Sequence, residues 1–307
     1  MDVQKMLYSK NGLSTRELAR MFIPFQVGER IPTVTTINEQ TKVARGTIQN
    51  AMKLLQSCGA ITVEARGHLG SFLIKKDMQK LLQIAGINAI VGVMPLPYSK
   101  RYEGFATGIL TTLKNTYQVP VAMAYMRGAQ KRIEHLISGR YDFAIISRYA
   151  AQKLEEENAQ IQVVQSFGKY SYLSEHVIIF RDKGFSSIEN GMKIGVDNDS
   201  VDQKMLTDMI CKDKEVQYIH VDYSQILKRV LSGEIDAAIW NKDEILDKAI
   251  DINYVELQVG EIPANEAVLV VNKEEKVMTS LLKHMIDVTT VNNIQNLVLE
   301  GKIEPSY

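Results

Sequence analysis

The 307-residue sequence has only two cysteines, one tryptophan and five histidines, so it offers little material for several kinds of site. Cys58 and Cys211 fall in segments that we assign below to different domains. A disulfide between them is therefore not expected, and a reducing cytoplasm fits this usage. Neither cysteine belongs to a metal-binding motif, and we expect no metal ion.

Long apolar runs are also missing. No stretch of about 18 apolar residues occurs, so we expect no membrane-spanning helix. The N-terminal sequence MDVQKMLYSKNG has no apolar core and no small-residue cleavage site, which argues against an export signal. We therefore expect a cytoplasmic protein.

Recognisable catalytic motifs are absent as well. We find no phosphate-binding loop, no nucleophile elbow and no paired His–Glu metal motif. The histidines, among them His135 and His176, are scattered and make no constellation. We therefore expect that the protein is not an enzyme and uses no cofactor.

Charge is distributed unevenly along the chain. The 36 Lys/Arg and 36 Asp/Glu residues cancel overall, but residues 1–76 hold eleven basic and five acidic residues. A segment of net charge +6 therefore precedes a remainder of net charge −6. A basic segment joined to an acidic one suggests that the first binds a polyanion.

The basic segment has the pattern of three helices followed by a hairpin. STRELARMFI opens with a Ser-x-x-Glu capping box, Ser14 and Glu17, and places apolar residues on one helical face. VGERIP predicts a turn, TVTTINEQTKV a second helix, and residues 44–59 a third helix that ends at Gly59. AITVEA and SFLIKK flank a tight turn at residues 67–70, which predicts a β-hairpin. This order is typical of a winged helix-turn-helix.

The third helix and its surroundings resemble the GntR-type winged helix. VGERIPT followed by VARGTIQNAMKLLQSCGAITVEARGHLGSFL is similar to that family's Pro-Gly-Glu-Arg-Leu-Pro turn, its Val-Ser-Arg-x-Thr-Val recognition helix and its Gly-rich wing. The resemblance implies that Arg45 and Thr47 contact DNA. Ala44 replaces the family's usual serine and Gln49 its usual arginine, so the operator is expected to differ from typical ones.

Six residues of this module have side chains that suit DNA contacts: Arg45, Thr47, Gln49, Asn50, Arg66 and His68. In the major groove the arginine at the helix start can bind guanine bidentately, and either amide can bind adenine. The threonine and the helix N-terminus suit phosphate, and the last two residues flank wing glycines that would let the backbone approach the minor groove. The alternative is that Arg45 is a surface ion-pair partner and Asn50 a solvated helix residue.

Residues 77–87 have a short helical pattern that predicts a linker. Its apolar residues Leu81, Leu82 and Ile84 could pack in a dimer seam or dock on the following domain. From Asn88 onward strand and helix patterns alternate, which indicates βαβ units and parallel pairing. We expect residues 88–307 to form a second, ligand-sensing domain.

Two phrases occur twice in this larger domain. LISGRYDFAII at residues 136–146 matches VLSGEIDAAIW at residues 230–240, and SEHVIIF at 174–180 resembles NEAVLVV at 265–271. We interpret the first pair as a helix, a glycine stop and an Asp-led strand in each of two lobes. The second pair then marks two strands that cross between the lobes. The predicted lobes are residues 88–174 with 267–307, and residues 175–266.

This arrangement resembles the type 2 periplasmic-binding-protein fold, which ligand-sensing domains of bacterial regulators also use. A GntR-like wing ahead of such a domain resembles the YhfZ-like group of regulators. LysR-type regulators share the effector fold, but they have a long linker helix and lack this wing pattern. The resemblance implies an α/β protein with an N-terminal winged helix-turn-helix and a two-lobed effector domain.

In open α/β sheets, ligands lie beyond the carboxyl ends of strands, near helix N-termini. The residues at these places are Tyr98, Ser99, Arg101, Arg127, Ser147, Arg148, Asn198, Ser200, Tyr223 and Trp240. The arginines favour a carboxylate or phosphate effector, and the aromatic rings could stack on an apolar part. Ser200 and Gln203 also form a Ser-x-x-Gln box. The alternative is that the arginines are surface charges, the tryptophan is core, and the serines at 99 and 200 are helix caps.

Together these features predict a ligand-responsive regulator that binds operator DNA as a dimer. Its recognition helices would lie about 34–36 Å apart, one DNA turn, and lobe closure on the effector would shift that spacing. A transport binding protein would share the larger fold but would need an export signal. An alternative that is harder to exclude from the sequence is a DNA-binding protein whose second domain is only a dimerisation or partner-binding module without effector.

Overall fold

The computed structural model describes residues 10–117, 119–157, 160–257 and 262–307, which divide into two compact units. Unit 1 takes the described residues of Met1–Ile90 with Lys114–Pro120 and Glu275–Met285, and unit 2 takes Val91–Leu113, Val121–Glu274 and Ile286–Tyr307. The N-terminal sequence in which we expect no export signal falls largely outside the described residues. The functional division at residues 76 and 88 stays a prediction.

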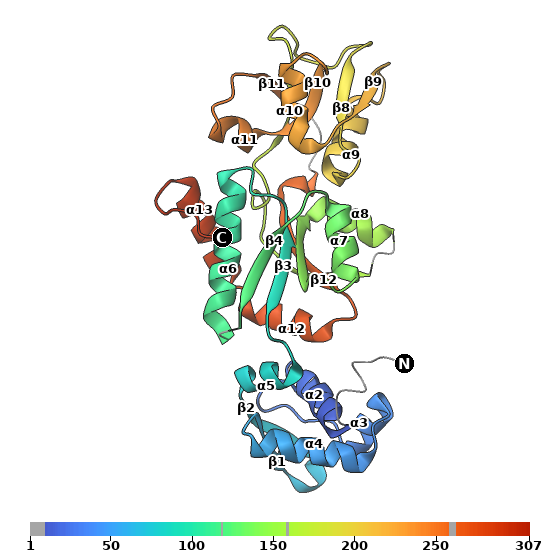
Figure 1. The fold of residues 1–307 in the computed structure, drawn as a ribbon, viewed down its shortest axis with the longest axis vertical. Helices are drawn as coiled ribbons and strands as arrows, with labels where there is room; N and C mark the ends of the chain where they lie inside the picture. Colours follow the sequence, from blue (N-terminus) through green and yellow to red (C-terminus); the bar gives the residue numbers. More distant parts are fainter. Residues whose placement is uncertain (1–9, 118, 158–159, 258–261) are drawn as a thin grey trace. The chain divides into compact units, whose positions relative to one another are not determined.

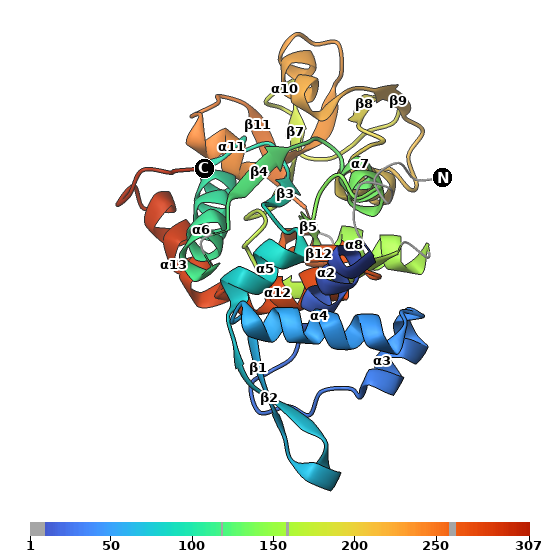
Figure 2. The same cartoon turned by 60° about the horizontal axis from the view of Figure 1, so that its bottom comes forward.

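Unit 1 contains three helices followed by a hairpin (Figure 1). These elements are α2 (Lys10–Phe22), α3 (Val34–Thr41), α4 (Arg45–Ser57), β1 (Ile61–Ala65) and β2 (Ser71–Lys76). The two strands pair antiparallel on either side of a 3₁₀ turn, η1 (Gly67–Leu69), and the hairpin extends away from α4 (Figure 2). Gly59, with φ of +71°, follows α4 in the left-handed conformation that the predicted helix stop requires.

The first helix starts earlier than the sequence pattern predicts. Helix α2 begins at Lys10, so Ser14 and Glu17 lie inside it and the predicted capping box at its start is wrong. The neighbouring Thr15 shows how a hydroxyl is accommodated there, because it donates to the carbonyl of Asn11 at 2.8 Å. A hydroxyl can thus be satisfied one turn back within a helix, and a Ser-x-x-Glu pattern alone does not fix a helix start.

Helix α5 (Met78–Ala85) follows the hairpin and packs against α2. Leu81 and Leu82 are buried within unit 1, and the guanidinium of Arg16 donates from Nε to the carbonyl of Ala85 at 3.0 Å. Asp77 caps the helix by accepting from the backbone N–H of Lys80. The two buried leucines are therefore used inside unit 1 and are not available to a dimer seam.

Unit 2 is built on two five-stranded mixed sheets. The first sheet has the order β4-β3-β5-β12-β6 and the second the order β9-β8-β10-β7-β11. The strands of the first are β3 (Ile90–Met94), β4 (Val121–Tyr125), β5 (Phe143–Ser147), β6 (Ile161–Ser166) and β12 (Ala267–Asn272). Those of the second are β7 (His176–Phe180), β8 (Lys193–Val196), β9 (Gln217–His220), β10 (Ala237–Asn241) and β11 (Asn253–Glu256). In each sheet the central strand, β5 or β10, runs parallel to one neighbour and antiparallel to the other.

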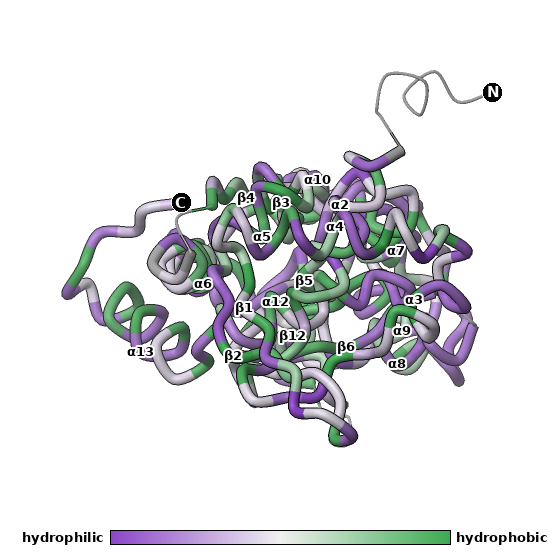
Figure 3. Tube along the Cα trace, turned by 90° about the horizontal axis from the view of Figure 1, so that it is seen from below, coloured by the Kyte–Doolittle hydropathy of each residue, from purple (hydrophilic) through white to green (hydrophobic). Residues whose placement is uncertain are grey.

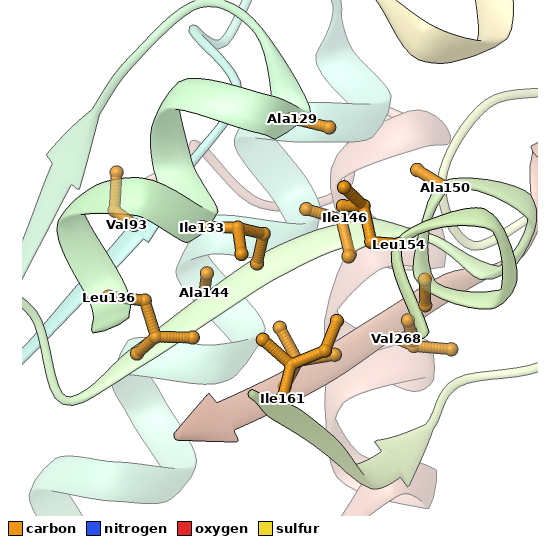
Figure 4. Close-up of a cluster of buried hydrophobic side chains, with 12 residues drawn as sticks. Val93, Ala129, Ile133, Leu136, Ala144, Ile146, Ala150, Leu154, Ile161 and Val268 are labelled. Carbon is orange, nitrogen blue, oxygen red and sulfur yellow. The ribbon is translucent and has the colours of Figure 1, made fainter. Parts of the chain in front are cut away.

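Helices connect and cover these sheets. They are α6 (Lys100–Tyr117), α7 (Ala129–Ile137), α8 (Arg148–Glu156), α9 (Val201–Ile210), α10 (Tyr223–Leu231), α11 (Lys242–Asp247) and α13 (Val288–Leu299). Helix α12 (Lys276–Met285) belongs to unit 1. On the first sheet, Ile133 and Leu136 of α7 and Leu154 of α8 pack with Ile146 and Val268 in a buried cluster (Figure 4). Burying such apolar surface is the main favourable contribution to folding.

The strands β7 and β12 cross between the two sheets, as the second repeated phrase predicts. β7 follows β6 of the first sheet but pairs in the second, and β12 follows β11 of the second sheet but pairs in the first. A glutamate precedes each crossing strand. The carbonyl of Glu266 accepts from the N–H of Arg148 at 2.8 Å, and the carbonyl of Glu175 accepts from the N–H of Lys242 at 3.1 Å. The repeat therefore fixes each crossing strand to the residue that follows a central strand.

The first repeated phrase encodes a backbone clamp. Gly139 and Gly233 both have φ of +75° and end the helices α7 and α10. Asp142 donates its N–H to the carbonyl of Val91 at 2.8 Å, and its Oδ2 accepts from the N–H of the same residue at 2.8 Å. Asp236 makes the same two bonds to Lys193, at 2.7 and 2.8 Å. Each aspartate therefore joins the start of a central strand to its parallel neighbour.

Hydrophobic residues along the chain occur in short stretches separated by hydrophilic ones (Figure 3). Among the described residues, no helix combines the length and apolar character that crossing a bilayer would demand. The apolar stretches instead supply the strands and helix faces of the two units.

The clamp predicts that Asp142 and Asp236 are important for stability. Asp142→Ala leaves the N–H of Val91 without its carboxylate acceptor, and we expect a loss of about 1–3 kcal/mol in the free energy of unfolding. Asp236→Ala is expected to cost a similar amount. Urea unfolding of the full chain followed by circular dichroism measures both, with the exposed Arg140→Ala of the same phrase as control. Equal midpoints for all three variants would contradict the clamp.

Candidate functional site

Helix α4 has one buried and one exposed face. The buried positions are Ile48, Ala51 and Leu55, and the predicted DNA contacts Arg45, Gln49 and Asn50 are exposed, with Thr47 half-buried. Ala44 occupies the N-cap position without a side-chain cap, so the first N–H groups of the helix can donate to a phosphate. Among the described residues Arg45 has no ion-pair partner, in contrast to the surface ion pair considered as its alternative role.

The wing presents two exposed side chains among the predicted DNA contacts, those of Arg66 and His68. Arg66 donates to Glu64 at 2.9 Å and lies over the ring of Phe72 at 4.7 Å, while His68 lies in the turn η1. The sequence analysis missed Arg30, whose guanidinium lies against Gly70 of the wing: a Cβ added there would approach Arg30 Nε to 2.7 Å. The arginine side chain could move aside, so it is the φ of +93° at Gly70 that favours glycine here.

Unit 2 contains a cavity of about 80 Å³ that is partly open to solvent. It lies beyond the carboxyl ends of β3, β8 and β10, where the fold predicts ligand binding. Both sheets contribute to its lining. The charged and aromatic lining residues are Tyr98, Tyr102, Arg127, Arg132, Tyr172, His176, Asp197, Asp202, Tyr223 and Glu244.

Four of the ten predicted effector contacts line this cavity: Tyr98, Arg127, Ser200 and Tyr223. The guanidinium of Arg127 is matched by three carboxylates, those of Asp222 at 2.6 Å, Asp199 at 3.1 Å and Asp197 at 3.5 Å. Its positive charge is therefore already neutralised within the protein. This arrangement reduces what Arg127 can offer to an anionic ligand.

The other two predicted arginines form ion pairs outside the cavity lining. Arg101 donates to Asp243 at 3.0 Å and to the carbonyl of Tyr170 at 2.7 Å. Arg148 donates to Glu266 at 2.7 Å, and Lys242 donates to Glu175 at the same distance in the second sheet. Glu266 precedes the crossing strand β12, so an effector that contacts Arg148 would have to replace the partly buried Arg148–Glu266 ion pair.

Three of the four predicted residues with hydroxyl or amide side chains, Ser99, Ser147 and Asn198, make hydrogen-bond contacts within the protein. Ser99 accepts from the N–H of Tyr102 at 3.5 Å, and Ser147 caps α8 through the N–H of Ala150 at 3.0 Å. Ser200 occupies the N-cap of α9 but makes no side-chain cap. The predicted box is therefore wrong, because the amide of Gln203 is used by Asp197 N–H and by the carbonyl of Gly195. Asn198 lies within hydrogen-bond distance of His220, at 3.0 Å, and outside the cavity lining.

Trp240 belongs to the core of the second sheet. Its ring stacks on Tyr223 with centroids 4.2 Å apart and planes 9° from parallel, and the side chain is 2% exposed. Tyr223 is the residue of this pair that lines the cavity, and its hydroxyl accepts from the N–H of Asn241. Trp240 therefore supports the cavity wall from behind. Effector contact by the predicted residues stays a prediction.

Arg132 is the charged residue that the sequence analysis missed. It is 2% exposed, and its guanidinium donates to the carbonyls of Met126 at 2.8 Å and Ile145 at 3.1 Å and to the hydroxyl of Tyr172 at 3.2 Å. No carboxylate of the described residues lies within ion-pair distance of it. A pattern in the sequence could have indicated it, because Arg132 is three residues after Ala129 and four before Leu136 on the buried face of α7.

Two buried acids were also missed. Burial raises the pKa of Asp202 to about 6, although the hydrogen bond from Ser147 and the charge of Arg132 lower it. Burial likewise raises the pKa of Glu244 to about 7 against the opposing charge of Lys248. The Oε1 atom of Glu244 is buried and has no hydrogen-bond partner in the described structure. Desolvation lowers the pKa of His176 to about 4, so its imidazole is neutral at pH 7.

Asp202 gives the stability of unit 2 a pH dependence with a definite sign. Because its pKa rises on folding from 3.8 to about 6, the folded state binds more protons than the unfolded chain between these values. The free energy of unfolding therefore falls as the pH rises through this window, by at most about 3 kcal/mol. We expect Asp202→Asn to gain stability relative to the unsubstituted protein as the pH rises from 4 to 6.5.

Urea unfolding at several pH values measures this difference. Comparison at each pH cancels the contributions of Glu244 and His176, which are present in both proteins and have opposite signs. Asp251→Asn, which changes an exposed carboxylate, is the matched control and should give a parallel profile. A parallel profile for Asp202→Asn would show that this side chain does not titrate as described.

Comparison with known sequences gives matches along most of the chain. Residues 26–73 match a helix-turn-helix domain family, and residues 77–307 match the YhfZ C-terminal domain family. The uncharacterized protein YhfZ of Escherichia coli K12 is 33% identical over 308 aligned residues, which cover 99% of this chain and 100% of that protein. The helix-turn-helix match is a general one, so the finer resemblance to GntR proteins stays a prediction.

Comparison with solved structures supports the same fold. The crystal structure of YhfZ from Shigella flexneri has a TM-score of 0.61 and 33% identity, covering 75% of this chain and 97% of that one. An ancestral arginine-binding protein bound to arginine has a TM-score of 0.53 and 17% identity, covering 71% and 99%. The second likeness is one of fold alone. A helix-turn-helix region is thus followed by a two-sheet domain that resembles periplasmic binding proteins, and the chain belongs to the YhfZ family.

Proposed function

We propose that this protein is a ligand-responsive transcriptional regulator. Its helix α4 and its wing would bind operator DNA, and the cavity of unit 2 would bind a small effector. The observation that supports this best is the presence, in one chain, of a helix-turn-helix with an exposed cationic helix start and a cavity lined by a buried arginine that has no ion-pair partner among the described residues.

The DNA-binding part rests on the chemistry of the exposed face of α4. Arg45 is exposed and unpaired among the described residues, next to helix N–H groups that lack a side-chain cap. Gln49 and Asn50 lie on the exposed face, where their amides can reach adenine. The net charge of +6 on residues 1–76 favours a polyanion in general. As a dimer, the protein would place two such helices one DNA turn apart, about 34–36 Å.

The effector-binding part rests on Arg132. A buried guanidinium without a carboxylate partner is costly, so the cavity has a place for an anionic group supplied from outside. The two-sheet fold resembles that of proteins with bound small molecules, among them the arginine-bound ancestral protein and a substrate-binding protein of Streptococcus pneumoniae bound to L-arginine. The effector would thus contain a carboxylate or phosphate.

Coupling between the two parts follows from the lining of the cavity. Residues that follow strands of both sheets line the cavity. A bound molecule would therefore contact both halves of unit 2 and could favour one arrangement of the two sheets over another. A ligand shifts such an equilibrium only by the difference in its affinity for the two states. The proposal therefore requires that DNA affinity change when the cavity is filled.

Arg45→Ala tests the DNA-binding part. We expect it to cost about 1–3 kcal/mol of specific binding, because a bidentate contact to a base is lost. An operator selected in vitro from random duplexes and a gel-shift titration measure this cost. Arg140→Ala removes one positive charge outside the DNA-binding residues and should leave affinity unchanged. Unaltered affinity of Arg45→Ala would remove this residue from the interface.

The coupling is tested by adding a small-molecule fraction of a bacterial extract to the operator complex. We expect the DNA affinity of the full chain to change by about 5–150-fold, the usual range of coupling between two sites. An affinity that stays constant would favour the alternative in which the second domain only dimerises or binds a partner. Failure to bind any duplex at low ionic strength would overturn the regulator itself.

A further inference from the structure

We propose that the effector is a small zwitterion. Its carboxylate would pair with Arg132, and its ammonium group would be bound by Glu244 and Asp202. This inference rests on the proposed function, because it specifies the ligand of the same cavity. It goes further by requiring two opposite charges on one molecule.

The anionic end follows from the position of Arg132. The guanidinium has five N–H donors, of which three are used by two carbonyls and the hydroxyl of Tyr172. These three acceptors are neutral, so they fix the orientation of the group without neutralising its charge. A carboxylate in the cavity would use donors that remain and would supply the missing negative charge.

The cationic end follows from two carboxylates of the same lining. Glu244 is 3% exposed, and its Oε2 accepts from Lys248 at 3.2 Å while its Oε1 has no partner in the described structure. Asp202 is 8% exposed, and its Oδ1 accepts from Ser147 at 2.8 Å. The Oδ2 of Asp202 makes no hydrogen bond to the described residues. An ammonium group has three donors and no acceptor, which is what these oxygens can bind.

Simpler ligands leave part of this arrangement unpaired. A phosphate or a plain carboxylate could pair with Arg132, but it would place a negative charge beside Glu244 and Asp202 and leave Oε1 without a donor. A plain amine would satisfy the two acids and leave the buried guanidinium without an ion-pair partner among the described residues. Arg127 cannot supply the balance, because three aspartates already neutralise it. A molecule with both groups pairs with all three side chains.

The cavity also limits the size and body of the ligand. Its volume of about 80 Å³ lies below the usual range of small-molecule sites, so the ligand must be small. The rings of Tyr98, Tyr102, Tyr172 and Tyr223 line it and offer apolar surface to the part of the ligand between or beside its charges. A short zwitterion fits this description.

The test uses the full-length protein and three matched panels in thermal-shift assays followed by calorimetry. The first panel contains the protein L-amino acids, β-alanine and 4-aminobutyrate. The second contains carboxylates that lack the amino group, together with inorganic phosphate, and the third contains the corresponding amines. We expect at least one zwitterion to stabilise the protein, and its two single-charge analogues to bind at least about tenfold more weakly.

Variants then assign the two ends of the bound zwitterion. Glu244→Gln preserves the shape of the side chain and is expected to weaken zwitterion binding at least about tenfold without weakening binding of the carboxylate analogue. Arg132→Lys preserves the charge but loses the fixed donor geometry, and it should weaken both the zwitterion and the carboxylate analogue. Asp251→Asn, an exposed carboxylate paired with Lys183, should leave binding unchanged.

The outcomes separate this inference from the proposed function. If anions bind and zwitterions bind no better, the inference is overturned while the regulator with an anionic effector stands. If no panel stabilises the protein, the inference is also overturned, and the operator assays decide independently whether the protein is a regulator. Unchanged zwitterion affinity in Glu244→Gln would overturn the assignment of the ammonium group.

Discussion

The hydrogen-bond clamp at the start of each central strand is the interaction on which the rest of unit 2 depends. Asp142 and Asp236 each use a backbone N–H and a carboxylate to join a central strand to its parallel neighbour. The carboxyl ends of these strands then lie beside the same cavity, where Ser147 reaches Asp202 and Asn241 lines the wall. Because the start of each central strand is fixed, the position of its last residue beside the cavity is fixed as well.

Charge pairing decides which ionisable residues remain for a ligand. Arg101, Arg127 and Arg148 all satisfy carboxylates of this chain, so their charges stabilise the arrangement of loops and crossing strands. Arg132 and Glu244 differ because they are buried and incompletely paired: Arg132 has no carboxylate within ion-pair distance in the described structure, and Oε1 of Glu244 has no hydrogen-bond partner there. Unpaired polar groups in a dry site are expensive, and a ligand that pairs them gains that free energy on binding.

Local patterns in the sequence predicted much of the fold. The three helices and hairpin of unit 1, the glycine stops and the crossing strands follow from periodicity, turn residues and two repeated phrases. The failures have local causes too. Ser14 does not start a helix because a helix interior can satisfy a hydroxyl, and Gln203 does not cap α9 because its amide is used by Asp197 N–H and the Gly195 carbonyl. The candidate site was predicted only in part, with Tyr98 and Tyr223 in the lining and Arg132 overlooked.

The sequence by itself determined the order of the helices and strands, the glycine stops of α7 and α10 and which phrases repeat, because these depend on backbone conformation and on neighbours a few residues away. Only the tertiary structure decided the pairing of charges. Arg148 meets Glu266 at a separation of 118 residues, and Arg101 meets Asp243 at a separation of 142. Ion pairing depends on distance in space and on removal of water, and neither can be derived from the spacing of residues along the chain.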